Sequence, residues 1–247
     1  MRIVIELQDI AKIYDPGAAE VRALNGVSLK IGAGEFVTIR GSSGSGKSTL
    51  MNILGCLDRP THGEYYLDGE NTQILTRTAL AHLRNRKLGF VFQGFNLLKR
   101  MSAIENVEMP LVYSGLSPAR RRAKALGMLD LVGLSHRAFH MPNQMSGGQQ
   151  QRAAIARALV NDPQILFADE PTGNLDSKTG QEILAEFERL NRELGQTIVM
   201  VTHDVAVAER APRQITVRDG VIASDIRRLP DPALGVRASA SPYPAAS

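Results

Sequence analysis

The chain has 247 residues, 43% of them hydrophobic and 22% charged, and its 29 Lys and Arg against 25 Asp and Glu give a formal net charge of +4. These values are typical of a globular protein and exclude a disordered or fibrous chain, and the scattered basic residues give no reason to expect a nucleic-acid partner. The single cysteine, Cys56, excludes an internal disulfide, and no apolar run reaches the roughly 18 residues of a membrane span, so a different chain would cross any membrane involved.

The first part of the chain is rich in β-forming residues. Alternating or β-branched segments predict strands over 3–7, within 21–31, and over 35–40, 63–68 and 88–92. A Gly/Ser loop after the third of these leads into a helix predicted over 47–57.

Helical patterns dominate from residue 95 to about 160, where Ser117 followed by Pro118 predicts a helix start. The rest of the chain predicts strands at 164–168 and 197–202, a helix over 177–194 ended by Gly195, and a hairpin of 215–218 with 221–223. Strands that alternate with helices favour a mainly parallel sheet covered on both faces.

This order of elements predicts an α/β fold with an N-terminal antiparallel β part and an inserted helical sub-domain. Residues 1–93 and 163–228 are expected to form the α/β core, and 94–162 the helical sub-domain. Residues 229–247, rich in Pro, Ala and Ser, are expected to be a disordered tail.

A phosphate-binding loop is predicted between the strand at 35–40 and the helix after it. GSSGSGKS at 41–48 fits the pattern G-x-x-x-x-G-K-[ST] of P-loop nucleotide-binding proteins. Its glycines let successive N–H groups face a triphosphate, Lys47 supplies a charge for the β- and γ-phosphates, and Ser48 a ligand for Mg²⁺. The predicted ATP-binding residues here are Gly41, Ser42, Ser43, Gly44, Ser45, Gly46, Lys47, Ser48 and Thr49.

An acidic pair follows the apolar strand at 164–168. Ligands in open α/β sheets bind at the carboxyl ends of strands, so both carboxylates are candidates for the site. We expect Asp169 to hold the Mg²⁺ shell and Glu170 to accept the proton of an attacking water. The alternative, a simple turn before Pro171, is less favoured beside a phosphate loop.

A third motif, MSGGQ at 145–149, precedes an Ala-rich helix. Ser146 and Gln149 fit a capping box, which does not explain two glycines in a first turn. The stretch resembles the L-S-G-G-Q signature of the nucleotide-binding subunits of ATP-binding cassette (ABC) transporters, with Met145 in place of Leu. That resemblance implies a head-to-tail homodimer with two ATP molecules, each between one phosphate loop and the partner's signature residues Ser146, Gly147, Gly148 and Gln149.

Further positions match the same family one by one. The resemblance implies that Tyr14 stacks on adenine and that Gln93 touches Mg²⁺ and senses the nucleotide. It also implies that Asp176 lies in the loop at the dimer interface and that His203 contacts the γ-phosphate. Glu170, His203 and Gln93 are thus the expected catalytic residues, and Ser48, Gln93 and Asp169 the expected metal ligands.

Several longer runs resemble one branch of the family, the lipoprotein-release and macrolide-export (LolD- and MacB-like) ATPases. Among them are LGFVFQGFNLL at 88–98 and FADEPTGNLDSKTG at 167–180. The resemblance implies an ATPase at the cytoplasmic face of the inner membrane that powers a separate integral-membrane permease of the MacB/FtsX-like type. The cargo would be a lipoprotein, a peptide or a drug-like molecule, and the permease would dock around Phe95–Leu98.

Three other functions remain as alternatives. The same ATPase could serve a membrane complex that regulates cell-wall enzymes without transport. A soluble relative acting on DNA or ribosomes is disfavoured by the short segment between Lys47 and Ser146 and by the single cassette. A P-loop kinase would leave the signature motif and His203 unexplained.

Overall fold

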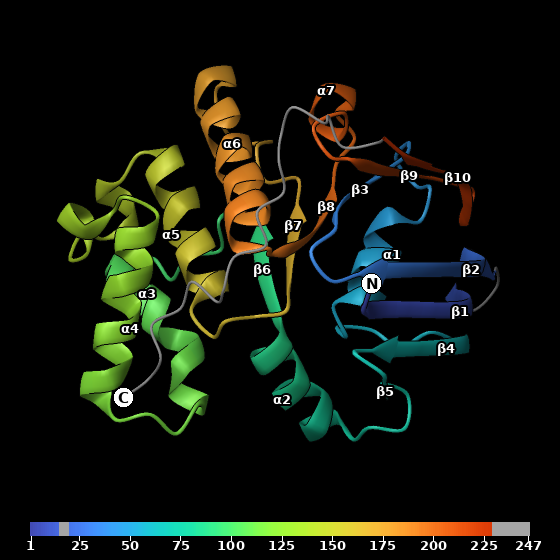
Figure 1. Ribbon diagram of the computed structural model, residues 1–247, viewed down its shortest axis with the longest axis horizontal. Coiled ribbons are helices and arrows are strands. Elements are labelled where there is room, and N and C mark those ends of the chain that lie inside the picture. Colours follow the sequence, from blue (N-terminus) through green and yellow to red (C-terminus); the bar gives the residue numbers. More distant parts are fainter. Residues whose placement is uncertain (15–19, 229–247) are drawn as a thin grey trace. The chain divides into compact units, whose positions relative to one another are not determined.

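The structure is a computed structural model that describes residues 1–14 and 20–228. The described residues form two compact units: unit 1 consists of residues 1–14, 20–84 and 190–228, and unit 2 of residues 85–189. Figure 1 labels their elements. The predicted helical sub-domain at 94–162 falls inside unit 2, and the predicted tail at 229–247 lies outside the described residues.

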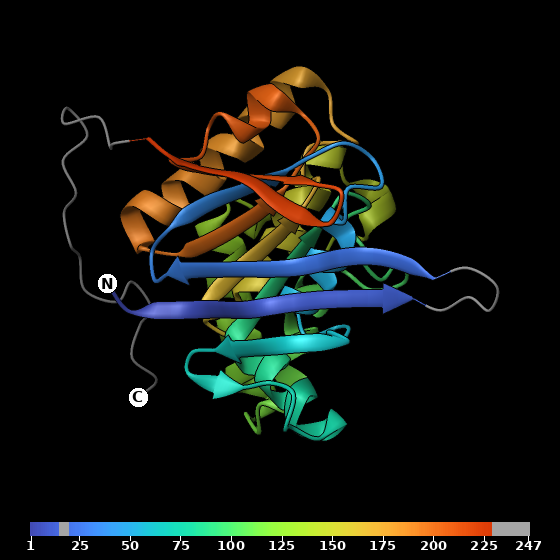
Figure 2. The same ribbon diagram turned by 90° about the vertical axis from the view of Figure 1, so that its right-hand side faces the viewer.

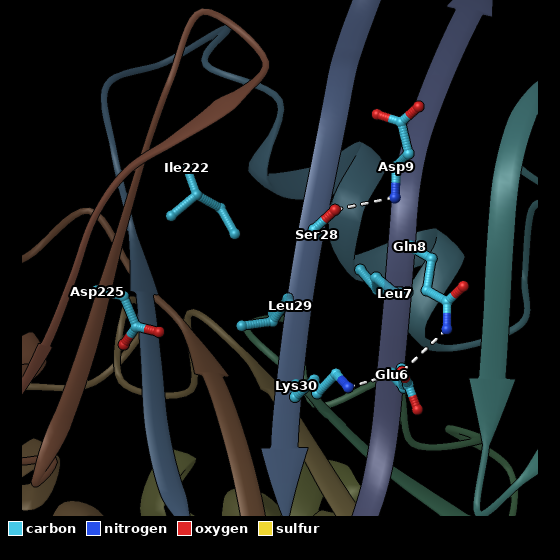
Figure 3. A pocket seen from close by; sticks show the side chains of 9 residues that line it. All are labelled: Glu6, Leu7, Gln8, Asp9, Ser28, Leu29, Lys30, Ile222 and Asp225. Carbon is cyan, nitrogen blue, oxygen red and sulfur yellow. Dashed lines mark hydrogen bonds and ion pairs between the residues drawn. The ribbon is translucent and has the colours of Figure 1, made fainter.

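Unit 1 contains an antiparallel sheet in the order β2-β1-β4-β5, whose long strands run side by side in Figure 2. Its strands are β1 (Ile3–Tyr14), β2 (Val21–Gly32), β4 (His62–Leu67) and β5 (Glu70–Asn71). β1 is longer than predicted because a bulge between Leu7 and Ile10 shifts its register and lets the strand resume. At the bulge Asp9 has φ of 52° and its N–H donates to the Ser28 hydroxyl at 3.0 Å (Figure 3).

Unit 1 also contains a largely parallel group of strands. They are β3 (Phe36–Arg40), β8 (Thr197–Val201), β9 (Arg213–Arg218) and β10 (Val221–Arg227), with the helices α1 (Lys47–Leu54) and α7 (Val205–Ala208). β3 pairs in parallel with β8 on one side and β9 on the other, and β10 closes the predicted hairpin on β9. β8 is buried along its whole length, as expected for a strand covered on both faces.

Unit 2 combines two parallel strands with helices. β6 (Leu88–Phe92) pairs with β7 (Ile165–Asp169), and α3 (Ala103–Glu108), α4 (Pro118–Leu131) and α5 (Gly147–Leu159) pack on one another. The 3-10 turns are Met109–Tyr113, Ser135–Arg137 and Pro142–Gln144, and α2 (Arg77–Lys87) and α6 (Ser177–Leu194) cross the unit boundaries. The predicted start of α4 is confirmed, because Ser117 caps the helix by accepting from the Arg120 N–H.

An ion cluster in unit 1 joins β9, β10 and the residue before β3. Arg213 is only 5% exposed and donates to Asp225 at 2.7 and 2.9 Å, to the Lys30 carbonyl at 2.8 Å, and to Glu35. The bonds from Arg213 hold the pKa of the Asp225 carboxyl below its ordinary value, although its partial burial acts in the opposite direction. The buried guanidinium therefore depends on ionised carboxylates around it.

Replacing Asp225 by asparagine is expected to lower the free energy of unfolding by about 1 kcal/mol at neutral pH, because the 34% exposure of its side chain screens the ion pair. A carboxyl whose pKa is lowered on folding stabilises the protein above its ordinary pKa, and this contribution is lost as the pH falls through the folded-state pKa. Denaturant unfolding of the wild type and Asp225→Asn should therefore converge as the pH falls below the ordinary value of 3.8. A stability difference independent of pH would contradict this role.

Candidate functional site

Two glycines of the phosphate loop in unit 1, Gly41 and Gly46, lie too close to neighbouring backbone for any side chain. A Cβ on Gly41 would lie 2.2 Å from the Val217 carbonyl oxygen, and one on Gly46 would lie 2.5 Å from the Ala23 carbonyl oxygen. Gly44, which has open space around it, and Gly46 have φ of 78° and 103°, in the left-handed region that favours glycine. The sequence motif therefore corresponds to a tightly curled backbone held against neighbouring strands.

The helix that follows the loop has an uncapped N-terminus. Gly46 occupies the N-cap position of α1 and has no side chain to accept a hydrogen bond from the first amides. The first turn carries no acidic residue. The Lys47 ammonium donates to the Ser42 carbonyl at 2.7 Å. Within the described residues the buried Ser45 hydroxyl has no hydrogen-bond partner. Free amides at a helix N-terminus, together with a lysine and a spare hydroxyl, fit the binding of a polyphosphate.

His203 lies at the same sheet edge as the phosphate loop. β3 and β8 run in parallel with Ile39 opposite Val201, and the Thr202 N–H continues the pairing by donating to the Ile39 carbonyl at 3.1 Å. Gly41 follows the carboxyl end of β3 two residues after Ile39, and the exposed His203 follows that of β8. Unit 1 thus places His203, the residue predicted to contact the γ-phosphate, at the edge where its phosphate loop begins.

Tyr14 occupies the end of β1 and is 39% exposed. Its hydroxyl donates to the Asp58 carboxylate at 3.0 Å, and the Lys12 ammonium lies 4.9 Å from its ring centroid. Lys12 and Asp58 were not predicted from the sequence, because nothing in the primary structure connects positions 46 residues apart. The exposed ring is suited to stacking on a base.

A second cluster of predicted residues lies in unit 2, at the carboxyl ends of β6 and β7. These strands pair in parallel with Phe92 opposite Asp169, so Gln93 and Glu170 follow at the same edge. Glu170 has φ of 45°, an uncommon conformation for a non-glycine residue. Such strain is found at functional sites, and the catalytic role of Glu170 stays a prediction.

Gln93 forms a reciprocal hydrogen-bond pair with Asn174. The Gln93 side-chain amide donates to the Asn174 side-chain oxygen at 3.2 Å, and the Asn174 amide donates to the Gln93 carbonyl at 3.0 Å. A Cβ on Gly173 would lie 2.6 Å from the Gln93 amide nitrogen, so a larger residue here would displace the Gln93 side chain. The sequence did not predict this contact, although Asn174 precedes Leu175 and Asp176 in the loop implied to lie at the dimer interface.

The signature segment forms the predicted capping box at the start of α5. The Gln149 N–H donates to the Ser146 hydroxyl at 3.3 Å, and the Ser146 N–H donates to the Gln149 side chain at 3.0 Å. A Cβ on Gly148 would lie 2.5 Å from the Thr179 methyl, and one on Gly147 would lie 3.1 Å from a Leu175 methyl. Packing within the chain is therefore a second reason for glycine at position 148, beside access of a phosphate to the helix end.

Asp176 caps the N-terminus of α6. Its carboxylate accepts from the Thr179 N–H at 3.0 Å. Hydrogen bonds from the Thr179 hydroxyl and backbone hold the pKa of the Asp176 carboxyl below its ordinary value. The residue is exposed, so it remains accessible to another molecule.

The loop at 95–98, predicted to contact a permease, is held by the side chains of Arg157 and Asn106. Arg157 donates to the Phe95 carbonyl at 2.9 Å and to the Asn96 carbonyl at 2.5 Å, and both of these residues have positive φ. The buried Asn106 bonds both the N–H and the carbonyl of Leu98, at 2.7 and 3.2 Å. Leu98 is 45% exposed, so its side chain lies at the surface rather than in the core.

The predicted residues are therefore divided between the units. Unit 1 holds Tyr14, residues 41–49 and His203, and unit 2 holds Gln93, Asp169, Glu170, Asp176 and the signature segment. Among the described residues no group of three His, Cys, Asp or Glu side chains could hold a metal ion. Mg²⁺ bound with a nucleotide takes most ligands from phosphates and water, so single groups such as the exposed Ser48 hydroxyl still fit it.

An open concavity of about 550 Å³ lies elsewhere in unit 1, between β10 and the strands β1 and β2 (Figure 3). Its lining includes Glu6, Asp9, Lys30 and Asp225, and none of the predicted site residues. In the part of the chain that the structure describes, no helix is long and apolar enough to cross a membrane.

A phosphate loop between a parallel strand and an uncapped helix defines this fold as that of a P-loop nucleotide-binding protein. The family model described as "ABC transporter" matches residues 24–173, and the chain belongs to that family. The predicted fold class is confirmed, since the chain superposes on the ATP-binding cassette MJ0796 in a dimeric post-hydrolysis state bound to ADP and Pi. The TM-score is 0.82 at 48% identity, covering 90% of this chain and 98% of that one. The chain is an ABC ATPase.

Two similar proteins differ in what accompanies the cassette. The macrolide export ATP-binding/permease protein MacB of Syntrophobacter fumaroxidans is 58% identical over 221 residues, which cover 89% of this chain and 31% of that protein. An uncharacterized ABC transporter ATP-binding protein of Thermotoga maritima is 54% identical over 92% of this chain and 97% of its own length. The chain thus spans about a third of the length of its MacB relative.

Proposed function

We propose that the chain is the ATP-hydrolysing subunit of a membrane transport complex and powers an integral-membrane permease of the MacB/FtsX-like type. The observation that carries this proposal is the 58% identity to the part of an ATP-binding/permease protein that the chain covers. The cargo would be a lipoprotein, a peptide or a drug-like molecule. The complex would place the chain peripherally at the cytoplasmic face of the inner membrane.

The proposed division of labour follows from the chemistry of the residues. The free amides of α1 and the Lys47 ammonium bind the ATP phosphates, and Tyr14 stacks on the adenine. Glu170 accepts a proton from the attacking water, and His203 contacts the γ-phosphate. Ser48, Gln93 and Asp169 hold Mg²⁺, which when bound neutralises phosphate charge during hydrolysis.

We further propose that two copies of the chain close head to tail around two ATP molecules. Support comes from the dimeric state named for the cassette MJ0796 and from the exposed Ser146 and Asp176. In such a dimer the start of α5 of one copy approaches the phosphates bound by the other. Closure and reopening would then transmit force to the permease.

Affinity purification of the tagged chain from its native membranes in mild detergent tests the partner. We expect an integral-membrane chain with a large extracytoplasmic domain to co-purify with the tagged chain. Leu98→Glu should reduce its recovery at least about tenfold while ATP binding persists, because a buried charge is costly at an interface.

Ile74→Glu provides the matched control, since Ile74 is 80% exposed and lies in unit 1. This variant should recover the permease as well as the wild type does. Co-purification of ribosomes or DNA without a membrane chain would overturn the transport function. Recovery of a permease together with cell-wall enzymes and no transported cargo would favour the regulatory alternative.

A further inference from the structure

The ring of Tyr14 is held by two side chains that belong to no predicted motif. Its hydroxyl donates to one oxygen of the Asp58 carboxylate at 3.0 Å, and the Lys12 ammonium donates to the other at 2.8 Å. The same ammonium lies 4.9 Å from the Tyr14 ring centroid and donates to the Arg59 carbonyl at 2.8 Å. The three side chains therefore form a closed arrangement, which we call the tyrosine clamp.

The clamp contains an ion pair between Lys12 and Asp58. Burial alone would raise the pKa of the Asp58 carboxyl, but hydrogen bonds from Lys12, the Arg59 backbone and Tyr14 lower it below the ordinary value. Asp58 is thus an anion at neutral pH and accepts from both neighbours. The Lys12 side chain is only 13% exposed, so its ammonium is committed to this arrangement rather than to solvent.

The clamp is also connected to the helix that follows the phosphate loop. The Asp58 N–H donates to the Asn52 carbonyl of α1 at 3.2 Å, and the Leu57 N–H donates to the same carbonyl at 2.8 Å. The anchor of the Tyr14 hydroxyl therefore belongs to the turn that ends α1, whose other end is the phosphate loop. Any shift of that helix would carry Asp58 with it.

A second connection runs through β2. Lys12 and Tyr14 of β1 pair with Leu24 and Val21 of β2. A Cβ on Gly46 of the phosphate loop would lie 3.0 Å from a Leu24 methyl, so the loop already contacts the strand that pairs with the clamp. Strand and helix together set the position of the Tyr14 ring relative to the phosphate loop.

We propose that Lys12 and Asp58 are positioning residues that hold the Tyr14 ring for the purine base of the nucleotide. Asp58 sets where the ring lies by binding its hydroxyl, and Lys12 occupies one face of the ring. The base then stacks on the opposite face, and the phosphates reach the loop at a set distance. This inference rests on the proposed stacking of Tyr14 on adenine.

Positioning of the base by Lys12 and Asp58 has a consequence that a purely stabilising role of these residues does not have. Holding the base should affect only ligands that carry a base, because the phosphates are bound by other groups. If Lys12 or Asp58 instead acted on the phosphates directly, or only stabilised the fold, its replacement would change the Kd of ATP and the Kd of tripolyphosphate by the same factor. The informative quantity is the ratio of the Kd of inorganic tripolyphosphate to the Kd of ATP.

The experiment measures both Kd values by titration calorimetry with Mg²⁺ present, on the full chain. Lys12→Met and Asp58→Ala should each raise the Kd of ATP about 3- to 10-fold, a part of the stacking contribution, and leave that of tripolyphosphate unchanged. Lys12→Arg, which keeps a cation on the ring, should restore the Kd of ATP to within about twofold of the wild type. Lys30→Met is the matched control, because Lys30 forms an exposed ion pair with Glu6 on the same sheet.

Two further variants keep the test decisive. Tyr14→Ala should raise the Kd of ATP by at least as much as the clamp variants. Tyr14→Phe loses only the bond to Asp58 and should raise the Kd of ATP about twofold. It replaces the Lys12 and Asp58 variants in the test if these fail to fold. If Tyr14→Ala leaves ATP binding unchanged, the assigned role of Tyr14 fails and the inference fails with it. If Tyr14→Ala weakens ATP binding while the clamp variants change neither ligand, or both equally, the inference alone is overturned.

Discussion

Glu170→Gln is expected to slow ATP hydrolysis by about 10²- to 10⁴-fold, which is the range that general-base catalysis contributes. Glutamine matches glutamate in size and shape, so it preserves the unusual backbone at this position, where φ is 45°. It cannot accept the proton of an attacking water. ATP binding should persist, because the phosphates are bound by other residues.

Hydrolysis that stops while binding persists should also trap the closed state. Size-exclusion chromatography with ATP should show Glu170→Gln as a dimer under conditions where the wild type returns to monomers. Glu193→Gln is a control of the same chemistry on an exposed position of α6, and its phosphate release should match that of the wild type. Unchanged turnover in Glu170→Gln would exclude this residue as the base.

The elements with strong local signals were predicted closely. The bounds of α6 agree with the prediction, because Ile183, Phe187 and Leu190 lie on one buried face and Gly195 ends the helix with φ of 64°. The end of α1 was predicted three residues too late, at Leu57. Gly55 ends it and Cys56 adopts φ of 53°, so the apolar pattern continues beyond the helix.

Elements whose formation depends on tertiary contacts were predicted poorly. The helix α2 has no clear signal in the sequence, because its surface is polar and only Leu80 and Leu83 are buried. The strand predicted to end at Leu7 continues to Tyr14, since the bulge at Asp9 interrupts the alternation without ending the pairing.

The candidate site shows the same contrast between local signals and long-range contacts. The phosphate loop and the signature could be predicted, because each is a contiguous run whose glycines and caps act locally. The pairing of Gln93 with Asn174 joins positions 81 residues apart, and that of Tyr14 with Asp58 joins positions 44 apart. Such contacts depend on which segments the fold brings together. The periodicity and composition of a local segment do not contain that information.

Lys47→Ala is expected to raise the Kd of ATP about 10- to 100-fold, the loss that corresponds to a hydrogen bond with a charged group. In the structure the Lys47 ammonium donates to the Ser42 carbonyl, a contact within the loop that a phosphate can replace at little cost. Because Lys47 binds the phosphates and not the base, the Kd of tripolyphosphate should rise by the same factor as that of ATP. This equal loss distinguishes Lys47 from the residues of the tyrosine clamp.

Titration calorimetry with both ligands checks the prediction, and thermal unfolding shows whether the variant keeps its fold. Lys30→Ala, which removes an exposed lysine of unit 1 outside the phosphate loop, should bind both ligands as the wild type does. A variant at Lys47 that is folded and binds both ligands normally would mean that the α1 amides alone hold the phosphates. The helix end and not the lysine would then determine nucleotide affinity.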